Sequence, residues 1–381
     1  MGIKSVEIQN FKSIKDSGKI ELGNINVLVG ANSSGKSNFI EFFNFLKNIA
    51  DEKLHIYIVK NNIDNVLHFG RKKSNYLSAK ILFHNDKEIY DAKKIVKDVV
   101  LENNGIEYEY SFSLTLNNNN KLVFAEEKGA IKKENIYTSY SIESAEEKTK
   151  ETSLRNAKDI YQKNILAYIH LSTIYHFNDT SMTSNLKTPS IIGKNKPFLD
   201  EDGRDIALFL YNFSKDYPKK FKVLEKIINS ISPSFKKFYL VPDEVTGEIY
   251  LQWIENDINS TIFPASCLSD GTLRFICLAA LLMHPIKPMT IILDEPELGL
   301  HPFAIEKLGA MIDVASEDSQ IILSTQSAEL IGQFSANDII VVERKDNETI
   351  FKRQSKKDLE NWIKDYSMGE IWCSNIIGGN P

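Results

Sequence analysis

Residues 26–38 read NVLVGANSSGKSN, and the stretch from Gly30 to Ser37 matches the phosphate-binding pattern G-x-x-x-x-G-K-S. The apolar residues before it predict a buried strand, and those after it predict a helix from Lys36 to about Ile49. In this context the glycines let backbone N–H groups turn toward phosphate oxygens, and the helix N-terminus adds a positive dipole. A glycine-rich surface turn is the alternative, and the flanking strand and helix argue against it.

This loop predicts a site for ATP and a magnesium ion. We expect Lys36 to reach the β and γ phosphates and to act in catalysis, and Ser37 to place its hydroxyl on Mg²⁺. The ATP-binding residues predicted from the loop are Gly30, Asn32, Ser33, Ser34, Gly35, Lys36, Ser37 and Asn38.

A second motif, MTIILDEPELGLHP, places two carboxylates directly after an apolar strand. If that strand is a buried parallel one, Asp294 joins the magnesium shell at its carboxyl end. Glu295, one residue further on, is then placed to orient and polarise the attacking water as the catalytic base. Adjacent carboxylates repel each other, so they need cations such as Mg²⁺ and Lys36 beside them. The alternative is an acidic turn after a core strand.

A third motif, CLSDGTLRFICLAALL, resembles a second anion site. Ser269, Asp270 and Gly271 precede a helix with apolar residues at helical spacing. A serine hydroxyl, backbone amides and a helix N-terminus together favour an anion, and we predict that these three residues bind ATP. The phosphate-binding loop and this third motif each lie at the start of a different helix. The third motif therefore suits a γ-phosphate that is presented by another subunit. A plain N-cap is the alternative.

The amino-acid composition limits the class of protein to which the chain can belong. The chain has 381 residues, of which 42% are hydrophobic and 25% charged, as is typical of soluble globular proteins. No stretch approaches the roughly 20 apolar residues of a membrane span, and the N-terminus lacks the apolar core of a signal peptide. We therefore expect a cytoplasmic protein without membrane contact. Its three cysteines form no CxxC pair, and its net charge of −5 argues against a general nucleic-acid coat while allowing a local basic patch.

The pattern of apolar residues changes along the chain. Both ends alternate strands and helices around the motifs, whereas the middle mixes alternating strands with helices. We predict that residues 1–50 and 234–381 fold together into one head and that residues 51–233 form an inserted lobe. Within the lobe, residues 164–177 are expected to form a buried strand, and the polar residues 142–162 a solvated helix or loop.

The order of these motifs resembles that of ABC-type ATPase heads, and most closely the RecF-like and SMC-like group with its OLD-type ATPases. The stretch VEIQNFKSIKD resembles that group's opening strand, LSDG its signature loop, LGLHP the loop after the Walker B strand, and STQS its switch. More narrowly, YHFNDTS and the final SMGEIWCSNIIGGNP resemble a compact family of bacterial AAA-type ATPases. The resemblance implies an α/β fold: a P-loop NTPase head with a mixed central sheet, flanking helices and an antiparallel β subdomain, carrying an inserted α+β lobe.

The resemblance also implies roles and partners. Lys12 would lie near the nucleotide, and a homodimer would close around ATP, with Lys36 of one chain facing Ser269 of the other. Gln326 stands in the switch where many ABC heads carry histidine, so it implies a neutral γ-phosphate sensor and slow or triggered hydrolysis. Relatives often lie beside a second gene in suspected phage-defence loci. This implies an effector partner, a nuclease or Toprim-like protein, with DNA as a further candidate.

Competing functions remain open at this point. An ATPase switch in DNA-related or defence processes is one, and a slow-turnover regulatory module that senses DNA or holds a nuclease or toxin inactive is another. A transporter nucleotide-binding subunit is disfavoured by the long spacing between Lys36 and Ser269. Basic runs at residues 71–73 and 219–222 are either solvated faces or phosphate contacts.

A few further residues have two interpretations each. Asn178 and Asp179 either replace the missing glutamine loop or form an Asx turn. His301 lies at a subunit boundary or in a turn before a helix, and Arg274 is a candidate contact for phosphate or for a partner's carboxylates. The segment 367–381 either docks on its own core or latches onto a partner.

Overall fold

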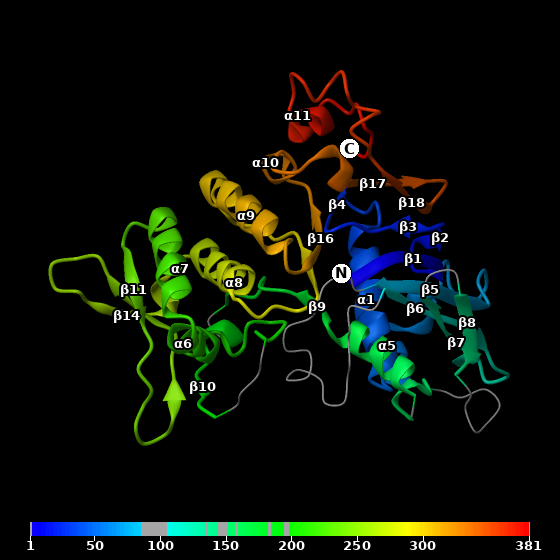
Figure 1. Ribbon diagram of the computed structural model, residues 1–381, viewed down its shortest axis with the longest axis horizontal. Coiled ribbons are helices and arrows are strands. Elements are labelled where there is room, and N and C mark those ends of the chain that lie inside the picture. Colours follow the sequence, from blue (N-terminus) through cyan, green and yellow to red (C-terminus); the bar gives the residue numbers. More distant parts are fainter. Residues whose placement is uncertain are drawn as a thin grey trace.

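The central element of the fold is a mixed sheet that carries the P-loop strand in its middle (Figure 1). The computed structural model of the chain describes residues 2–84, 105–133, 136–142, 151–156, 159–181, 184–193 and 198–380. The strand order is β18-β17-β4-β16-β15-β9; neighbours from β17 to β9 pair in parallel, and β18 is antiparallel to β17. Its strands are β4 (Ile25–Val29), β9 (Ser172–Tyr175), β15 (Thr290–Asp294), β16 (Gln320–Thr325), β17 (Ile339–Lys345) and β18 (Glu348–Arg353). The predicted mixed central sheet is confirmed.

A second, antiparallel sheet contains the chain's first strand. Its main order is β2-β1-β5-β6-β7-β8, and β3 also pairs with β1. Along β6, buried and half-buried side chains alternate, as in a strand with one face in a core. The strands are β1 (Gly2–Phe11), β2 (Ile14–Asp16), β3 (Ile20–Glu21), β5 (Tyr76–His84), β6 (Ile106–Leu116), β7 (Leu122–Lys133) and β8 (Ile136–Ser141). This is the predicted antiparallel β subdomain.

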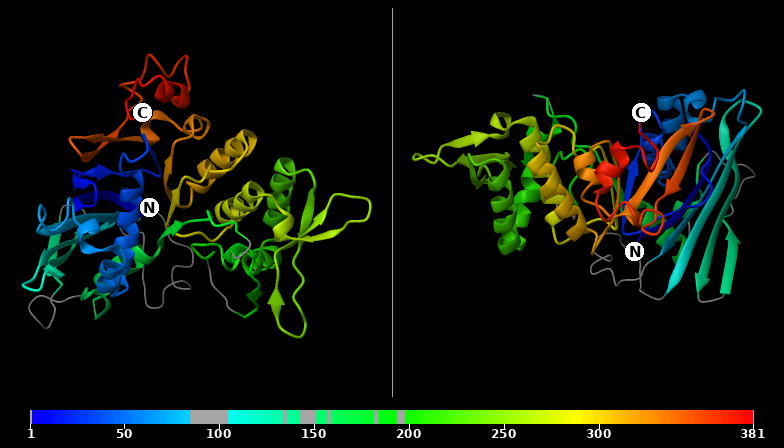
Figure 2. Two further views of the ribbon diagram at one scale, coloured as in Figure 1. Left: turned by 180° about the vertical axis from the view of Figure 1, so that it is seen from behind. Right: turned by 90° about the horizontal axis from the view of Figure 1, so that it is seen from above.

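The two faces of the central sheet belong to different hydrophobic cores. Successive side chains of a strand point to opposite faces, so β4 contributes to both. Leu28 lies in the cluster that contains α1 (Lys36–Ala50) and the antiparallel sheet. Val27 and Val29 lie in the cluster that contains the helices of the other side. The views in Figure 2 agree that these two layers lie on opposite sides of the central sheet.

The helical side holds the signature helix α8 (Asp270–Met283) and its neighbours. Residues 206–231 form two helices with Pro218 at the start of the second, where its missing N–H costs nothing. Strand β11 pairs antiparallel with β13. The elements are α6 (Ile206–Asp216), α7 (Pro218–Ile231), β11 (Phe235–Tyr239), β12 (Glu248–Ile249), β13 (Gln252–Glu255), β14 (Ile262–Pro264), α9 (Pro302–Ala315) and α10 (Ala328–Ile331).

The prediction of a single buried strand over residues 164–177 is wrong. The first half of this run belongs to helix α5 (Ile160–His170), and only Ser172–Tyr175 forms strand β9. The side chain of Asp159 caps the helix by accepting a hydrogen bond from Tyr161 N. A mostly apolar run such as this one gives no clear periodicity that separates a buried helix from a buried strand. Of the neighbouring prediction for residues 142–162, residues 143–150 and 157–158 lie outside the described residues, and in the described part Leu154–Asn156 form a short 3-10 turn and α5 begins at Ile160.

The division into a head and an inserted lobe stays a prediction. Two segments of the predicted lobe pair with strands of the predicted head: β5 with β1, and β9 with β15. Further elements of the predicted lobe are α2 (Leu54–Asn61), α3 (Ile63–Val66) and β10 (Ser190–Ile191). Within the described ranges, no helix is both long enough and apolar enough to cross a membrane.

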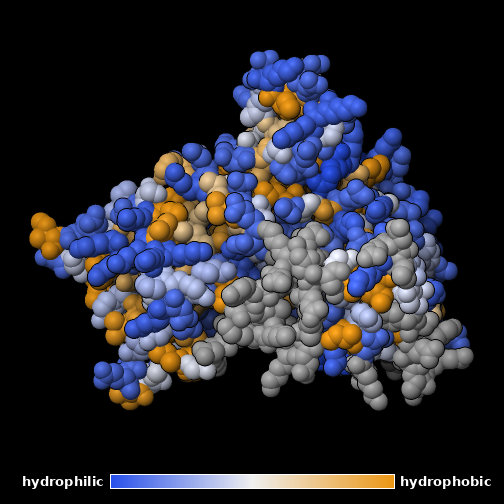
Figure 3. Space-filling model, in the orientation of Figure 1, coloured by the Kyte–Doolittle hydropathy of each residue, from blue (hydrophilic) through white to orange (hydrophobic). Residues whose placement is uncertain are grey.

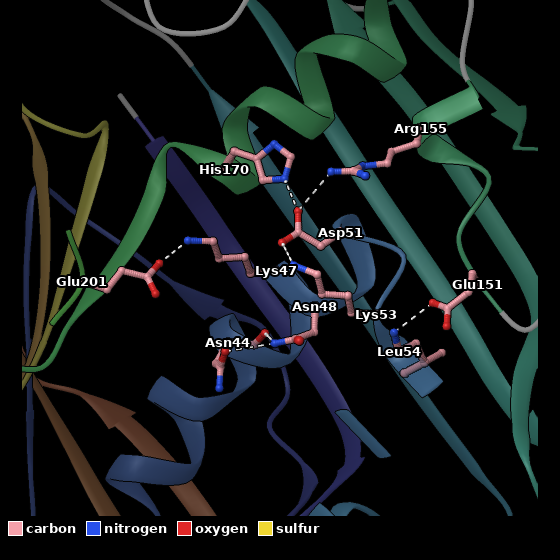
Figure 4. A network of polar contacts seen from close by, with 10 residues as sticks. All are labelled: Asn44, Lys47, Asn48, Asp51, Lys53, Leu54, Glu151, Arg155, His170 and Glu201. Atoms are coloured by element: carbon pink, nitrogen blue, oxygen red, sulfur yellow. Dashed lines mark hydrogen bonds and ion pairs between the residues drawn. The ribbon is translucent and has the colours of Figure 1, made fainter. Parts of the chain in front are cut away.

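Charged side chains hold the C-terminal end of α1, the helix that follows the P-loop (Figure 4). Asp51 lies 3.1 Å from Nε2 of His170 at the end of α5 and forms an ion pair with Arg155. Lys47 forms an ion pair with Glu201. Burial raises the pKa of Asp51, but the hydrogen bonds that the carboxylate accepts outweigh burial and lower it overall. These contacts join α1 to α5 and to the segment before α6.

Candidate nucleotide site

The P-loop connects β4 to α1 in a conformation that needs its glycines. Gly35 has a φ of 115° at the N-terminus of α1, and a Cβ there would lie 2.2 Å from Thr349 Oγ1. A Cβ on Gly30 would lie 2.1 Å from the carbonyl oxygen of Val342. Both positions therefore exclude a side chain. The hydroxyl of Ser34 is buried and has no hydrogen-bond partner within the described residues, so the loop retains a free donor that fits a phosphate oxygen.

Lys36 folds back onto its own loop. Its ammonium donates to the carbonyl oxygens of Gly30, at 2.6 Å, and Ala31, at 2.9 Å. Burial lowers the pKa of Lys36, and the nearby carboxylates of Glu295 and its neighbours partly oppose that shift. The lysine predicted to reach phosphates thus lies within the electrostatic field of the residues predicted to hold magnesium.

The switch segment, residues 324–326 at the end of β16, forms hydrogen bonds to the acidic residues at the end of β15 and just beyond it. The hydroxyl of Ser324 donates to Asp294 Oδ1. The side-chain amide of Gln326 donates to Glu295 Oε1. Glu295 itself has a φ of 47°, which is unusual for a residue other than glycine, and its backbone N–H donates to the carbonyl of Ser324 at 3.1 Å. Backbone and side chains therefore hold this turn in one arrangement.

A third carboxylate, Glu297, completes the cluster. Its Oε1 accepts from the hydroxyl of Thr325, at 2.5 Å, and from the backbone N–H of Gln326, at 3.1 Å. Burial raises the pKa of Glu297 above its usual value, although these hydrogen bonds favour the charged form. Asp294, Glu295 and Glu297 all act electrostatically on Lys36. Among the described residues no group of three or more Asp, Glu, His or Cys side chains is arranged to hold a metal ion, so Mg²⁺ bound here would take ligands from the nucleotide phosphates and from Ser37 as well as from Asp294.

A chain of hydroxyls supports the P-loop from the antiparallel side. Thr349 Oγ1 donates to the carbonyl of Ser34 at 2.9 Å and lies 2.7 Å from Ser13 Oγ. The side chain of Asn38 donates to the same Ser13 oxygen at 2.6 Å. Lys12, next to Ser13, has a φ of 48° and a pKa lowered by burial, with Glu41 partly opposing the shift. Lys12 therefore lies in the turn that contacts the P-loop helix.

The signature motif begins α8 and contacts the loop after β15. Ser269 is the N-cap, and its hydroxyl accepts from Thr272 N at 3.1 Å. A Cβ on Gly271 would lie 2.4 Å from the carbonyl oxygen of Gly299, so glycine is required for this close packing. Arg274 donates to the carbonyl of Leu298 at 2.7 Å. Within this single chain Ser269 is therefore an N-cap. Its binding to a γ-phosphate from another subunit is a proposal.

The other candidate residues form hydrogen bonds that stabilise turns and helix ends within this chain. The carboxylate of Asp179 accepts from Ser181 N at 3.0 Å in an Asx turn, and the carbonyl of Asn178 accepts from Arg274 at 2.8 Å. His301 caps α9, accepting from Phe303 N at 3.3 Å. In the basic run at residues 71–73, the guanidinium of Arg71 donates to both oxygens of Asp64, at 2.9 and 2.7 Å, and lowers the pKa of that carboxyl to about 2.

Most of the predicted site residues therefore lie close together, but the signature residues contact other parts of the chain. Asp294 and Glu295 act electrostatically on Lys36 of the P-loop, and Gln326 donates to Glu295, whereas Lys12 lies in the turn that contacts α1. Ser269, Asp270 and Gly271 start a helix on the other face of the central sheet. Sequence reasoning missed Glu297, Ser324, Thr325, Ser13 and Thr349. A third acid close behind Asp294 was a signal for Glu297, whereas nothing in the sequence marks the contact between Ser13 and Thr349.

The fold is that of a P-loop NTPase head of the ABC type. A family profile described as "AAA domain, putative AbiEii toxin, Type IV TA system" matches residues 25–332. The chain therefore belongs to this family of AAA-type ATPases, as the resemblance to ABC-type and SMC-like heads implied. A comparison with the curated proteins gives no match.

Solved structures of SMC head domains share the fold. An SMC head bound to the C-winged helix domain of ScpA matches with a TM-score of 0.58 and 17% identity, covering 94% of this chain and 99% of that chain. An SMC head with an extended coiled coil, bound to the C-terminal domain of ScpA derived from Pyrococcus furiosus, matches with a TM-score of 0.54 and 13% identity, covering 96% and 99%. Identities this low show a common fold and nothing about partners.

Proposed function

We propose that this protein binds ATP together with Mg²⁺ and hydrolyses it slowly or on a trigger. The observation that supports this most strongly is the switch segment 324–326, whose residues hydrogen-bond to all three carboxylates beside Lys36. Lys36 and the P-loop amides would hold the phosphates, and Ser37 and Asp294 would hold the metal. Magnesium, when bound, neutralises charge on the β and γ phosphate oxygens.

The contact between Gln326 and Glu295 supports slow or triggered turnover. As the catalytic base, Glu295 must accept a proton from the attacking water. Here its Oε1 already accepts a hydrogen bond from the Gln326 amide. The amide NH2 carries two N–H donors, so it could keep this hydrogen bond while it donates to a γ-phosphate, and one side chain would then link the catalytic base to the nucleotide.

The signature residues support a homodimer in which each ATP lies between two chains. Ser269, Asp270 and Gly271 begin a helix that packs on the loop after β15, away from the P-loop of the same chain. Facing a second chain, the Ser269 hydroxyl and the helix N-terminus would bind the γ-phosphate. Closure around ATP and release after hydrolysis then form a two-state switch.

The dimer is tested by sedimentation of the full chain with Mg²⁺ and ATP, with Mg²⁺ and ADP, and without nucleotide. We expect the ATP sample to sediment at twice the mass of the ADP sample, because only ATP brings a γ-phosphate to Ser269. A hydrolysis-deficient variant sharpens the result by removing turnover. The same mass in all samples would contradict the proposed switch.

Glu297 should act as a positioning residue for the switch. Glu297→Ala removes the acceptor of Thr325 and of the Gln326 backbone, so we expect kcat of ATP hydrolysis to fall about tenfold while KM changes little. Glu297→Gln is the matched control, because an amide oxygen still accepts both hydrogen bonds, and it should keep most of the activity. Equal kcat values for the alanine variant and the unaltered chain would rule out this role.

We propose further that the switch controls an effector in a phage-defence or DNA-related process. The name of the matching family, which refers to a toxin of a toxin–antitoxin system, favours a defence setting. A nuclease or Toprim-like effector and DNA stay candidate partners. The second candidate function is a regulatory module that keeps an effector inactive, and the contact between Gln326 and Glu295 favours it. ATP turnover measured with and without DNA ends distinguishes a triggered switch from a constitutive ATPase.

A further inference from the structure

Residues 367–380, hereafter the strap, fold back onto their own chain. The strap contains helix α11 (Met368–Cys373), whose buried side chains Ile371 and Trp372 join the core on the helical side, as does Ile377 beyond the helix. In Figure 3 the outer surface at the top of the molecule, where α11 lies in Figure 1, is mostly hydrophilic. The apolar side chains of the strap are therefore used inside this chain.

The strap first contacts the helix that follows the switch. Helix α10 begins directly after Ser327, one residue beyond Gln326. A Cβ on Gly369 would lie 2.1 Å from the carbonyl oxygen of Ala328, so α11 packs against the backbone of α10 with no space for a side chain. Helices α10 and α11 are therefore in direct contact.

The far end of the strap contacts the P-loop. The backbone N–H of Gly379 donates to Glu343 Oε1 at 2.8 Å. Gly379 has a φ of 75°, and a Cβ there would lie 2.8 Å from a methyl carbon of Val341 and 3.4 Å from the Cα of Gly30. Beside this contact lies a cavity of about 410 Å³, lined by residues 31–34, 342–345, 379 and 380. The strap thus forms part of the wall next to the phosphate loop.

We propose that the strap couples the switch to the P-loop and that it must be docked for full ATP affinity. This inference rests on the proposed ATP site and adds its regulation. One segment contacts both the helix after Gln326 and the first glycine of the P-loop, so it restricts both elements before ATP arrives. A loop that is already ordered loses less conformational entropy when it binds its ligand. A strap that leaves its place would release the P-loop and weaken binding.

The test compares ATP affinity, measured with a fluorescent ATP analogue, in two strap variants and a matched control. Gly379→Val removes the left-handed glycine and adds methyl groups against Val341, so it displaces the far end. Trp372→Ala loosens α11 and adds no atom near the P-loop. We expect both to weaken ATP binding by about fivefold or more, within the usual range of coupling between sites. Cys373→Val, at an exposed position of α11, should bind ATP as the unaltered chain does.

Hydrogen exchange without nucleotide supplies a second readout that does not depend on ATP. Amides of residues 29–35 should exchange faster in both strap variants than in the control, with thermal unfolding confirming that each variant is folded. If the unaltered chain binds ATP and the folded variants bind it equally well, the strap proposal is overturned and the ATP site stands. If the unaltered chain binds no ATP, the proposed function fails and the coupling fails with it.

Discussion

Replacing Glu295 with glutamine should abolish ATP turnover and leave ATP binding intact. Glutamine keeps the size of the side chain, but it cannot take a proton from the attacking water. The change leaves every residue of the P-loop in place, including Gly30 and Lys36, and removes only one of the charges that act on the Lys36 ammonium. We expect kcat to fall by about 10²–10⁴-fold, the usual contribution of a positioned general base.

The measurement is phosphate release under saturating ATP, together with the affinity for a fluorescent ATP analogue. Glu306→Gln is the matched control, because it makes the same chemical change on an exposed position of α9 and should leave turnover unchanged. The variant should also remain dimeric with ATP for longer than the unaltered chain, since the γ-phosphate is not removed. Full hydrolysis by Glu295→Gln would show that another group activates the water.

Mixing two inactive variants should restore activity if the site is shared between chains. Lys36→Ala removes the phosphate-binding ammonium, and Ser269→Arg places a long cation where the partner's γ-phosphate would lie. Each variant alone has no intact pair of P-loop and signature, so each should be inactive. In a mixed dimer, one site combines the intact Lys36 of one chain with the intact Ser269 of the other.

The expected recovery has a definite size. Random exchange of chains gives mixed dimers about half of the time, and each mixed dimer has one working site out of two, so turnover should reach about a quarter of the unaltered level. The control mixes each variant with a chain that carries both substitutions, which offers no intact pair. Two folded variants that regain no activity when mixed would refute the shared site.

Local patterns explain which parts could be predicted from the sequence. The P-loop and the pair Asp294 and Glu295 were visible because each lies within a few residues of the strand that positions it. The run 164–177 was misread because its apolar residues satisfy a buried helix as well as a buried strand. The hydroxyl contact between Ser13 and Thr349 was invisible because it joins residues 336 positions apart. Such contacts depend on the whole topology and leave no local pattern.

The position of β4 has a consequence for synthesis of the chain. This strand leaves the ribosome early, yet both of its neighbours in the sheet, β16 and β17, come from residues 320–345. The side chain of Gln320 likewise bonds to the backbone of Ile3 across 317 positions. Pairings so distant in sequence form late and fold slowly. A nascent chain should therefore remain unable to retain nucleotide until nearly all of it has been translated, and partial chains would expose the apolar strand to chaperones.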